Sequence, residues 1–282
     1  MRLLAFLLLT TTCLFAQTPD GEEIDAETLL KRLDDSIYYP GREGLKDFRF
    51  RWKTAGDGVF EGLNDDLYIA YAWKTPGHVR LEYVNAEGNR IEKLPEIAKH
   101  PELVNVFKQL EGMGHALAQQ LIVGAPYAEV YADYFKRLER RVINNKVEYD
   151  IVLTPKQKKR WTQIVIRVIE GLPRQVTKTD DQGRSLRLFL RFEPRGKKHI
   201  ASGLRVEQNN QLVMDEVYSY TRIDGVSVLS QLVRATSIPE PSKETIRLER
   251  LQANIGLEDS YFTAAEKQSG DGDSKGAKEK KD

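Results

Sequence analysis

The sequence predicts an α+β protein: a strongly curved antiparallel β-sheet (a half-barrel) with helices covering its concave face. Hydrophobic segments with a period of two dominate the chain, segments with a period near 3.6 interrupt them, and Gly, Pro and Asn turns separate them. The clearest hairpin is residues 70–83, AYAWKTPGHVRLEY, where two alternating segments meet at a Thr-Pro-Gly turn. Such a sheet has one apolar face that must be covered.

Composition narrows the class of protein. The chain has 282 residues, of which 40% are hydrophobic and 30% are charged, with a net charge of +1. These values fit a globular protein of one large or two small domains. Because a nucleic-acid-binding domain normally carries a basic surface, we expect no nucleic-acid partner. We predict a single domain over residues 17–263.

The N-terminus has the pattern of a secretory signal peptide over residues 1–16. Arg2 precedes an apolar run, and small residues lead to Ala16, the expected cleavage site, so we expect a periplasmic protein. The alternative is a lipoprotein signal at Cys13, the only cysteine, but Thr10 occupies the position where such signals carry an aliphatic residue. Cleavage after Ala16 leaves no thiol for a disulfide, a zinc site or a nucleophile.

The first half of the mature chain predicts a helix, three strands and a helical block. Residues 25–38 form an amphipathic helix with Asp25 as N-cap. Residues 48–52 alternate apolar and basic side chains as a first strand, and the hairpin follows. From 94 to about 142 the period changes to 3.6, which predicts a helical insertion whose last helix spans 128–141.

The second half returns to a period of two. It brings the expected total to between nine and eleven strands; those after the insertion lie at about 147–155, 164–168, 173–178, 186–192, 200–207, 211–222, 226–236 and 245–254. Residues 264–282 contain Gly, Ser, Lys, Asp and Glu without apolar anchors, which predicts a disordered tail.

The polar residues do not form a recognisable catalytic or metal motif. The four histidines lack metal-ligand spacing, and acidic pairs such as Asp180-Asp181 fit turns better than acid–base catalysis. The basic run 156–160, KQKKR, fits a solvated hairpin end, with contact to anionic lipid head groups as the alternative. We therefore expect no catalytic residue, metal site or cofactor, and a protein that is not an enzyme.

The helices leave two interpretations of the apolar face. They fill it and form a plain core, which pattern alone favours, or they act as a lid over an apolar cavity suited to acyl chains. In the second case the first strand and the hairpin supply the cavity lining, namely Phe50, Trp52, Ile69, Tyr71, Trp73, Leu81 and Tyr83.

The hairpin 73–83, WKTPGHVRLEY, resembles that of the LolA-like family, the periplasmic carriers of outer-membrane lipoproteins. The helix and strand over 25–52, the segments 149–155 and 172–192, and the closing segment 254–262 match the family in order. The helical insertion is longer than the family's usual lid, Trp52-Lys53 replaces a polar residue, and the tail is extra.

The resemblance implies a carrier that binds acyl chains of lipoproteins or lipids in an apolar cavity and moves them through the cell envelope. It implies that Arg80 holds the helical lid closed by bonding to lid backbone, whereas alternation alone leaves Arg80 as a cross-strand surface charge. We expect a monomer with an envelope membrane protein as a possible partner. The alternatives are a non-catalytic sensing or protein-interaction module and an enzyme acting on envelope polymers.

Overall fold

The computed structural model describes residues 24–56, 68–75, 77–89, 124–238 and 240–262. The predicted signal peptide, residues 94–123 of the predicted helical block and the predicted tail lie outside the described residues. In chain order the elements are α1 (Ala26–Ser36), β1 (Asp47–Gly56), β2 (Tyr68–Lys74), β3 (His78–Val84), α3 (Tyr127–Val130), β4 (Tyr134–Ile143), β5 (Lys146–Pro155), β6 (Trp161–Ile169), β7 (Leu172–Asp180), β8 (Ser185–Arg195), β9 (Lys198–Gln208), β10 (Gln211–Ile223), β11 (Val226–Thr236) and β12 (Ser242–Ala253).

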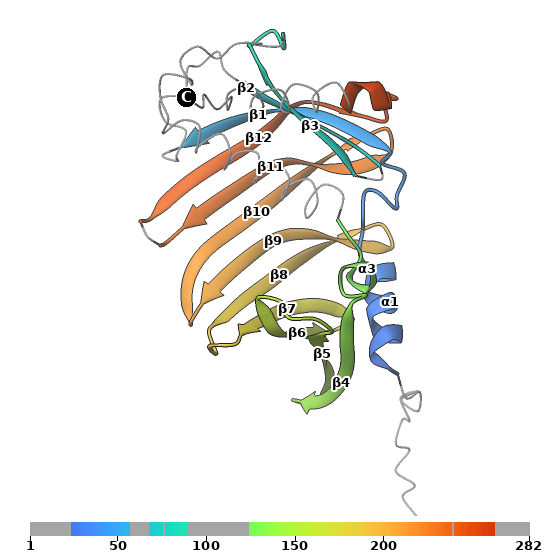
Figure 1. Cartoon of the computed structure of the whole chain (residues 1–282), viewed down its shortest axis with the longest axis vertical. Coiled ribbons are helices and arrows are strands. Elements are labelled where there is room, and N and C mark those ends of the chain that lie inside the picture. Colours follow the sequence, from blue (N-terminus) through green and yellow to red (C-terminus); the bar gives the residue numbers. More distant parts are fainter. Residues whose placement is uncertain (1–23, 57–67, 76, 90–123, 239, 263–282) are drawn as a thin grey trace, which may run out of the picture.

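The strands form one antiparallel sheet, which bends strongly and confirms the predicted fold class (Figure 1). Its order is β3-β2-β1-β12-β11-β10-β9-β8-β7-β6-β5-β4, so β3 and β4 are the edges. Strands that are consecutive in sequence pair with each other, except β3 and β4, and β1 pairs with β12 as well as with β2. This one long-range pairing joins the N-terminal hairpin to the C-terminal meander. Among the described residues there are twelve strands, more than the nine to eleven predicted.

The additional strand is β4, and the helix predicted over 128–141 is wrong. In this part of the chain the structure has helix only at Tyr127–Val130, and β4 pairs with β5 along its whole length. Asn144 and Asn145 join the two strands with φ angles of 50° and 61°, the backbone of a two-residue hairpin turn. β4 is an edge strand with many exposed charged residues, which obscure its period of two. Its apolar residues recur at a spacing that also fits a helix. The Asn144-Asn145 turn distinguishes the two alternatives.

Cross-strand partners project their side chains to the same face, so the register defines one continuous concave face. It carries two buried clusters. The α1 cluster, at the β4 end, comprises Ala26, Leu29, Leu30, Leu33, Tyr131, Tyr134, Ile151, Leu153, Ile164, Ile166, Val168 and Val176. The β1 cluster, at the other end, comprises Leu45, Phe48, Phe50, Trp52, Ile69, Tyr71, Trp73, Tyr218, Val226, Val228, Leu229, Leu232, Ile246, Leu248 and Ala253.

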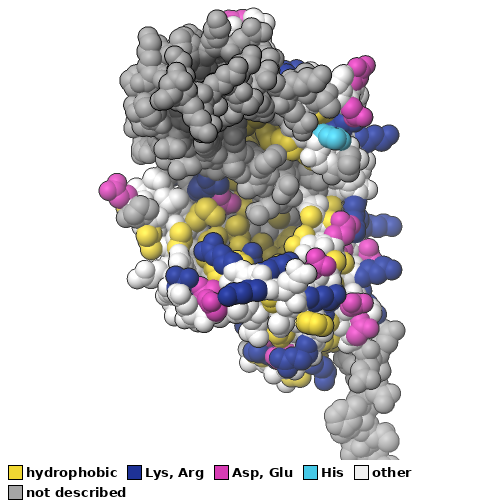
Figure 2. Space-filling view, in the orientation of Figure 1, with side chains coloured by type: hydrophobic (Ala, Val, Ile, Leu, Met, Phe, Trp, Pro, Cys, Tyr) yellow, Lys and Arg dark blue, Asp and Glu magenta, His cyan; other side chains and the backbone are white. Residues whose placement is uncertain are grey.

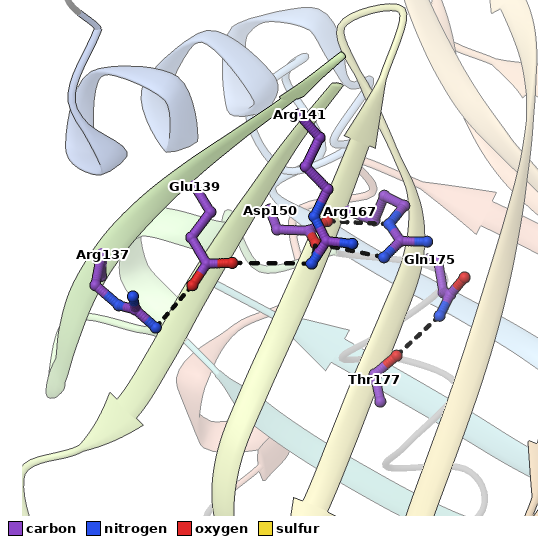
Figure 3. A network of polar contacts seen from close by, with 7 residues as sticks. All are labelled: Arg137, Glu139, Arg141, Asp150, Arg167, Gln175 and Thr177. Carbon is purple, nitrogen blue, oxygen red and sulfur yellow. Dashed lines mark hydrogen bonds and ion pairs between the residues drawn. The ribbon is translucent and has the colours of Figure 1, made fainter. Parts of the chain in front are cut away.

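The convex face is polar where β4, β5 and β6 meet (Figure 3). The Asp150 carboxylate is almost completely buried and pairs with Arg141 at 2.7 Å and with Arg167 at 3.0 Å. Glu139 links Arg137 to Arg141 along β4. These charged pairs keep the convex side of this end hydrophilic, so the concave face is the apolar one.

Helix α1 forms as predicted and is held by its own polar contacts. The side chain of Asp25 caps the helix by accepting a hydrogen bond from the Thr28 amide at 2.7 Å. On the buried face Asp34 accepts three further hydrogen bonds, from the Tyr39 hydroxyl at 2.8 Å and from the backbone amides of Tyr127 and Ala128 at 2.7 and 2.9 Å. Asp34 therefore fixes α3, and the chain leading into β4, against α1.

Replacement of Asp34 by Ala should destabilise the fold by about 3 kcal/mol, because two amides and a hydroxyl lose a charged acceptor. The measurement is the free energy of unfolding from urea titration. Asp35→Ala is the matched control: Asp35 is exposed, and its loss should change stability by less than about 0.5 kcal/mol. Equal losses for the two variants would contradict the role assigned to Asp34.

Candidate functional site: the concave face

The seven residues predicted to line a cavity lie on one face and in one cluster. The register places Phe50, Tyr71 and Leu81 in one row and aligns Trp52 with Ile69 in the next. The other two members are Trp73 and Tyr83. Five of the seven are buried members of the β1 cluster, and Leu81 and Tyr83 pack against it half-buried.

Because most of these residues are buried, substituting them is a poor test of ligand binding. Trp73 is only 4% exposed, so an Asp at this position would remove packing from the sheet as well as any ligand contact. A test of binding therefore needs concave positions that are accessible in the folded protein.

Such positions occur on β8, β9 and β10, between the two buried clusters. We call them the central stripe; its members are Leu186, Leu188, Leu190, Leu204, Val206 and Met214, all half-buried except the buried Val206. Leu188 and Leu190 also contact the α1 cluster, and Leu204 contacts the β1 cluster. Figure 2 shows hydrophobic side chains gathered across the middle of the molecule and framed by Lys and Arg.

The sequence predicts these strands, but the predicted lining residues come only from the first strand and the hairpin. The available signal was the alternation over 186–192, where Leu186, Leu188, Leu190 and Phe192 share one face. Alternation alone does not tell which apolar strand faces are only partly covered, because that depends on which distant segments pack against the sheet.

A buried charged cluster continues the same face beside the stripe. The register runs from Leu204 through Glu216 and Arg234 to Glu244. Arg234 Nε donates to Glu216 Oε1 at 2.7 Å, and the Tyr218 hydroxyl donates to Glu216 Oε2 at 2.7 Å. Both oxygens of Glu216 are thereby satisfied on an otherwise apolar face.

Glu244 is less well compensated. It is 9% exposed, its Oε2 lies 3.9 Å from Arg234 Nη1, and its buried Oε1 has no hydrogen-bond partner within the described part of the chain. Burial raises the pKa of Glu244; Arg234 opposes this shift, and the neighbouring Glu216 adds to it. Two carboxylates thus share one guanidinium.

Lys178 is a second polar group on this face. Its cross-strand neighbours on either side are Ile164 and Leu186. Burial lowers the pKa of Lys178, since the charged ammonium is partly removed from water. The concave face therefore combines apolar area with a few polar groups, a composition typical of ligand sites.

Arg80 projects from the opposite face, as its alternation with Val79 and Leu81 predicts. It is 8% exposed and donates to the backbone carbonyl of Tyr261 and, at 2.5 Å, to Glu82. The Tyr261 ring lies 4.3 Å from the guanidinium carbon, and its hydroxyl donates to Glu82 at 2.8 Å. Arg80 thus holds the C-terminal segment; a bond from it to residues 90–123 falls outside the described part of the chain and stays a prediction.

Within the described ranges, no group of three His, Cys, Asp or Glu side chains is placed to hold a metal ion. The same residues include no helix with the length and hydropathy needed to span a membrane.

Comparison with known proteins gives structural neighbours only. No protein-family model and no curated protein matches the sequence. Among solved structures, a DUF1329 family protein from Desulfovibrio piger is 13% identical, with a TM-score of 0.31 over 84% of this chain and 95% of that one. A LolA superfamily protein from Nitrosomonas europaea is 11% identical, with a TM-score of 0.31 over 85% and 97%. A domain described as an outer membrane lipoprotein-sorting protein, from Vibrio parahaemolyticus, is 10% identical, with a TM-score of 0.32 over 85% and 97%.

Glu244→Gln should make the stability of the protein less dependent on pH. The pKa of Glu244 is raised in the folded state, so the wild type loses stability as pH rises through that value, whereas Gln stays neutral. The variant should therefore be more stable than the wild type at about pH 8, and this advantage should shrink at about pH 4. Urea midpoints at both values are the measurement. The exposed Glu240→Gln should show no such difference; an equal shift at both pH values in Glu244→Gln would contradict the interpretation.

Proposed function

We propose that the protein is an exported carrier that holds an acyl chain of a lipid or lipoprotein on the central stripe of its concave face and moves it through the cell envelope. The observation that carries the proposal is the pair of packed clusters separated by half-buried leucines, from Leu186 on β8 to Leu204 on β9. The resemblance of the hairpin 73–83 to the LolA-like carriers supports it.

The energetics of the stripe are adequate for this role. Each buried methylene contributes about 0.8 kcal/mol, so ten methylenes supply roughly 8 kcal/mol before the cost of association. This is enough for reversible binding at micromolar to millimolar concentrations. A carrier must release its cargo, so moderate affinity on a partly covered face suits the task better than a closed cavity.

The second candidate is a protein-interaction module on the same fold. The feature that favours it is the edge strand β4, where Val142 and Ile143 are 61% and 42% exposed near the turn to β5. An unpaired strand edge with exposed apolar side chains can add a strand from a partner. A pulldown that recovers one envelope protein, from a preparation without lipid, would favour this function.

Leu204→Asp should weaken binding of a fluorescent fatty-acyl probe by at least tenfold, because it places a charge in the stripe. Val217→Asp is the matched control: Val217 lies one residue from Glu216 on β10 but on the convex face, and it is 49% exposed. It should bind the probe as the wild type does.

Two further measurements complete this test. Circular dichroism of both variants separates lost binding from lost folding. Mass spectrometry of organic extracts from the purified wild type should identify a bound lipid. The carrier proposal fails if no preparation contains lipid and the wild type does not bind the probe.

A further inference from the structure

The turn between β5 and β6 carries a concentrated positive charge. Lys156, Lys158, Lys159 and Arg160 are all exposed within five residues. The turn borders a pocket of about 350 Å³ that is lined by Lys158, Lys159, Arg160, Asp180, Asp181 and Arg184. We call Lys156, Lys158, Lys159 and Arg160 the basic turn.

The acidic residues of the pocket do not neutralise the basic turn. The carboxylate of Asp180 is hydrogen-bonded within its own turn. It accepts from the Gln182 amide at 3.0 Å and from the Arg184 amide and Nε at 2.9 and 2.7 Å. In the part of the chain that the structure describes, no carboxylate lies within ion-pair distance of Lys158, Lys159 or Arg160. Their charges remain available to an anion; the acidic residues nearby are Asp181 of the pocket and the exposed Asp133, whose backbone carbonyl accepts from the Lys156 amide at 3.1 Å.

Aromatic rings stand beside these cations. Phe135 is 65% exposed at the start of β4, opposite Thr154 in the register, and Lys156 Nζ lies 6.0 Å from its ring centroid. Lys159 and Arg160 lie over the rings of Tyr134 and Trp161, at 4.6 and 4.8 Å. Cationic side chains beside an exposed aromatic ring match the interfacial layer of an anionic bilayer, where phosphates lie above the acyl region.

The basic turn also lies at the end of the sheet where the central stripe begins. Trp161 pairs with Asp180, and Leu186 of the stripe follows Arg184 by two residues. On the concave face Lys178 is the cross-strand partner of Leu186 and precedes Asp180 of the pocket by two residues. A membrane that contacts the basic turn would therefore lie next to one end of the stripe.

We propose that the basic turn, together with Phe135, docks the protein on a bilayer rich in anionic phospholipid. Lys158, Lys159 and Arg160 bind lipid phosphates, and the ring of Phe135 enters the interface between head groups and acyl chains. The docking surface is distinct from the central stripe and does not require it to bind an acyl chain.

Sedimentation with lipid vesicles tests the proposal on the full chain. The wild type should bind vesicles containing phosphatidylglycerol, bind pure phosphatidylcholine vesicles weakly, and lose binding in high salt. Lys158→Glu/Lys159→Glu should reduce binding to the anionic vesicles at least tenfold, and Phe135→Ser should reduce it by roughly fivefold.

The control is Lys197→Glu/Lys198→Glu, the same charge change at the β8–β9 hairpin, where Lys197 lies in the turn and Lys198 begins β9 and pairs with Glu43 at 2.6 Å. This variant should bind the vesicles nearly as the wild type does. Equal losses for the two double variants, or equal binding of the wild type to both kinds of vesicle, would overturn the proposal. The proposal would also be overturned if the wild type sedimented with neither kind of vesicle but bound an acidic protein. Acyl-probe binding by Lys158→Glu/Lys159→Glu should stay unchanged, so this proposal and the carrier function can fail separately.

Discussion

The structure depends on one constraint: a cross-strand register that keeps a single face apolar across the whole sheet. Because side chains alternate, a slip of one residue in any pair would turn that strand's apolar side chains to the convex side. The register is interrupted at several points, including Arg191/Phe192 on β8 and Ser219/Tyr220 on β10. At such irregularities the strand bends while the apolar face continues beyond them, which lets a long sheet curve.

The pairing of β1 with β12 makes this face continuous. Phe48 faces Ala253 and Trp52 faces Leu248, so the first and last strands of the fold contribute to one cluster. At the other end the apolar face is covered by α1, which Asp34 links to the chain that leads into β4. Among the described residues the two clusters therefore lie at opposite ends of this face, and the concave positions between them on β8, β9 and β10 are mostly half-buried.

Much of the fold followed from the sequence, because strand alternation and turn residues are local signals. The hairpin 70–83, the helix with Asp25 as N-cap and most of the C-terminal meander were predictable in this way. The edge strand β4 was not, since its exposed charged residues hide the alternation and its apolar spacing fits a helix equally well. Its hairpin turn, Asn144-Asn145, was the local signal that could have corrected the assignment.

The candidate site was less predictable, because it depends on contacts between distant strands. Arg80 could be placed on the opposite face from Leu81, but its partner Tyr261 lies far along the chain. Likewise, nothing local indicates that Glu216 and Glu244 would share Arg234 on an apolar face.

That charged cluster bears on the choice between a plain core and a binding face. A core gains little from buried ions, since their desolvation offsets most of their attraction. Both oxygens of Glu216 are nevertheless hydrogen-bonded, whereas one buried oxygen of the neighbouring Glu244 has no hydrogen-bond partner among the described residues. A face that combines half-buried leucines with an incompletely compensated carboxylate retains both apolar area and hydrogen-bonding capacity. An amphipathic ligand with a donor group can use both, and a second layer of apolar side chains can use only the first.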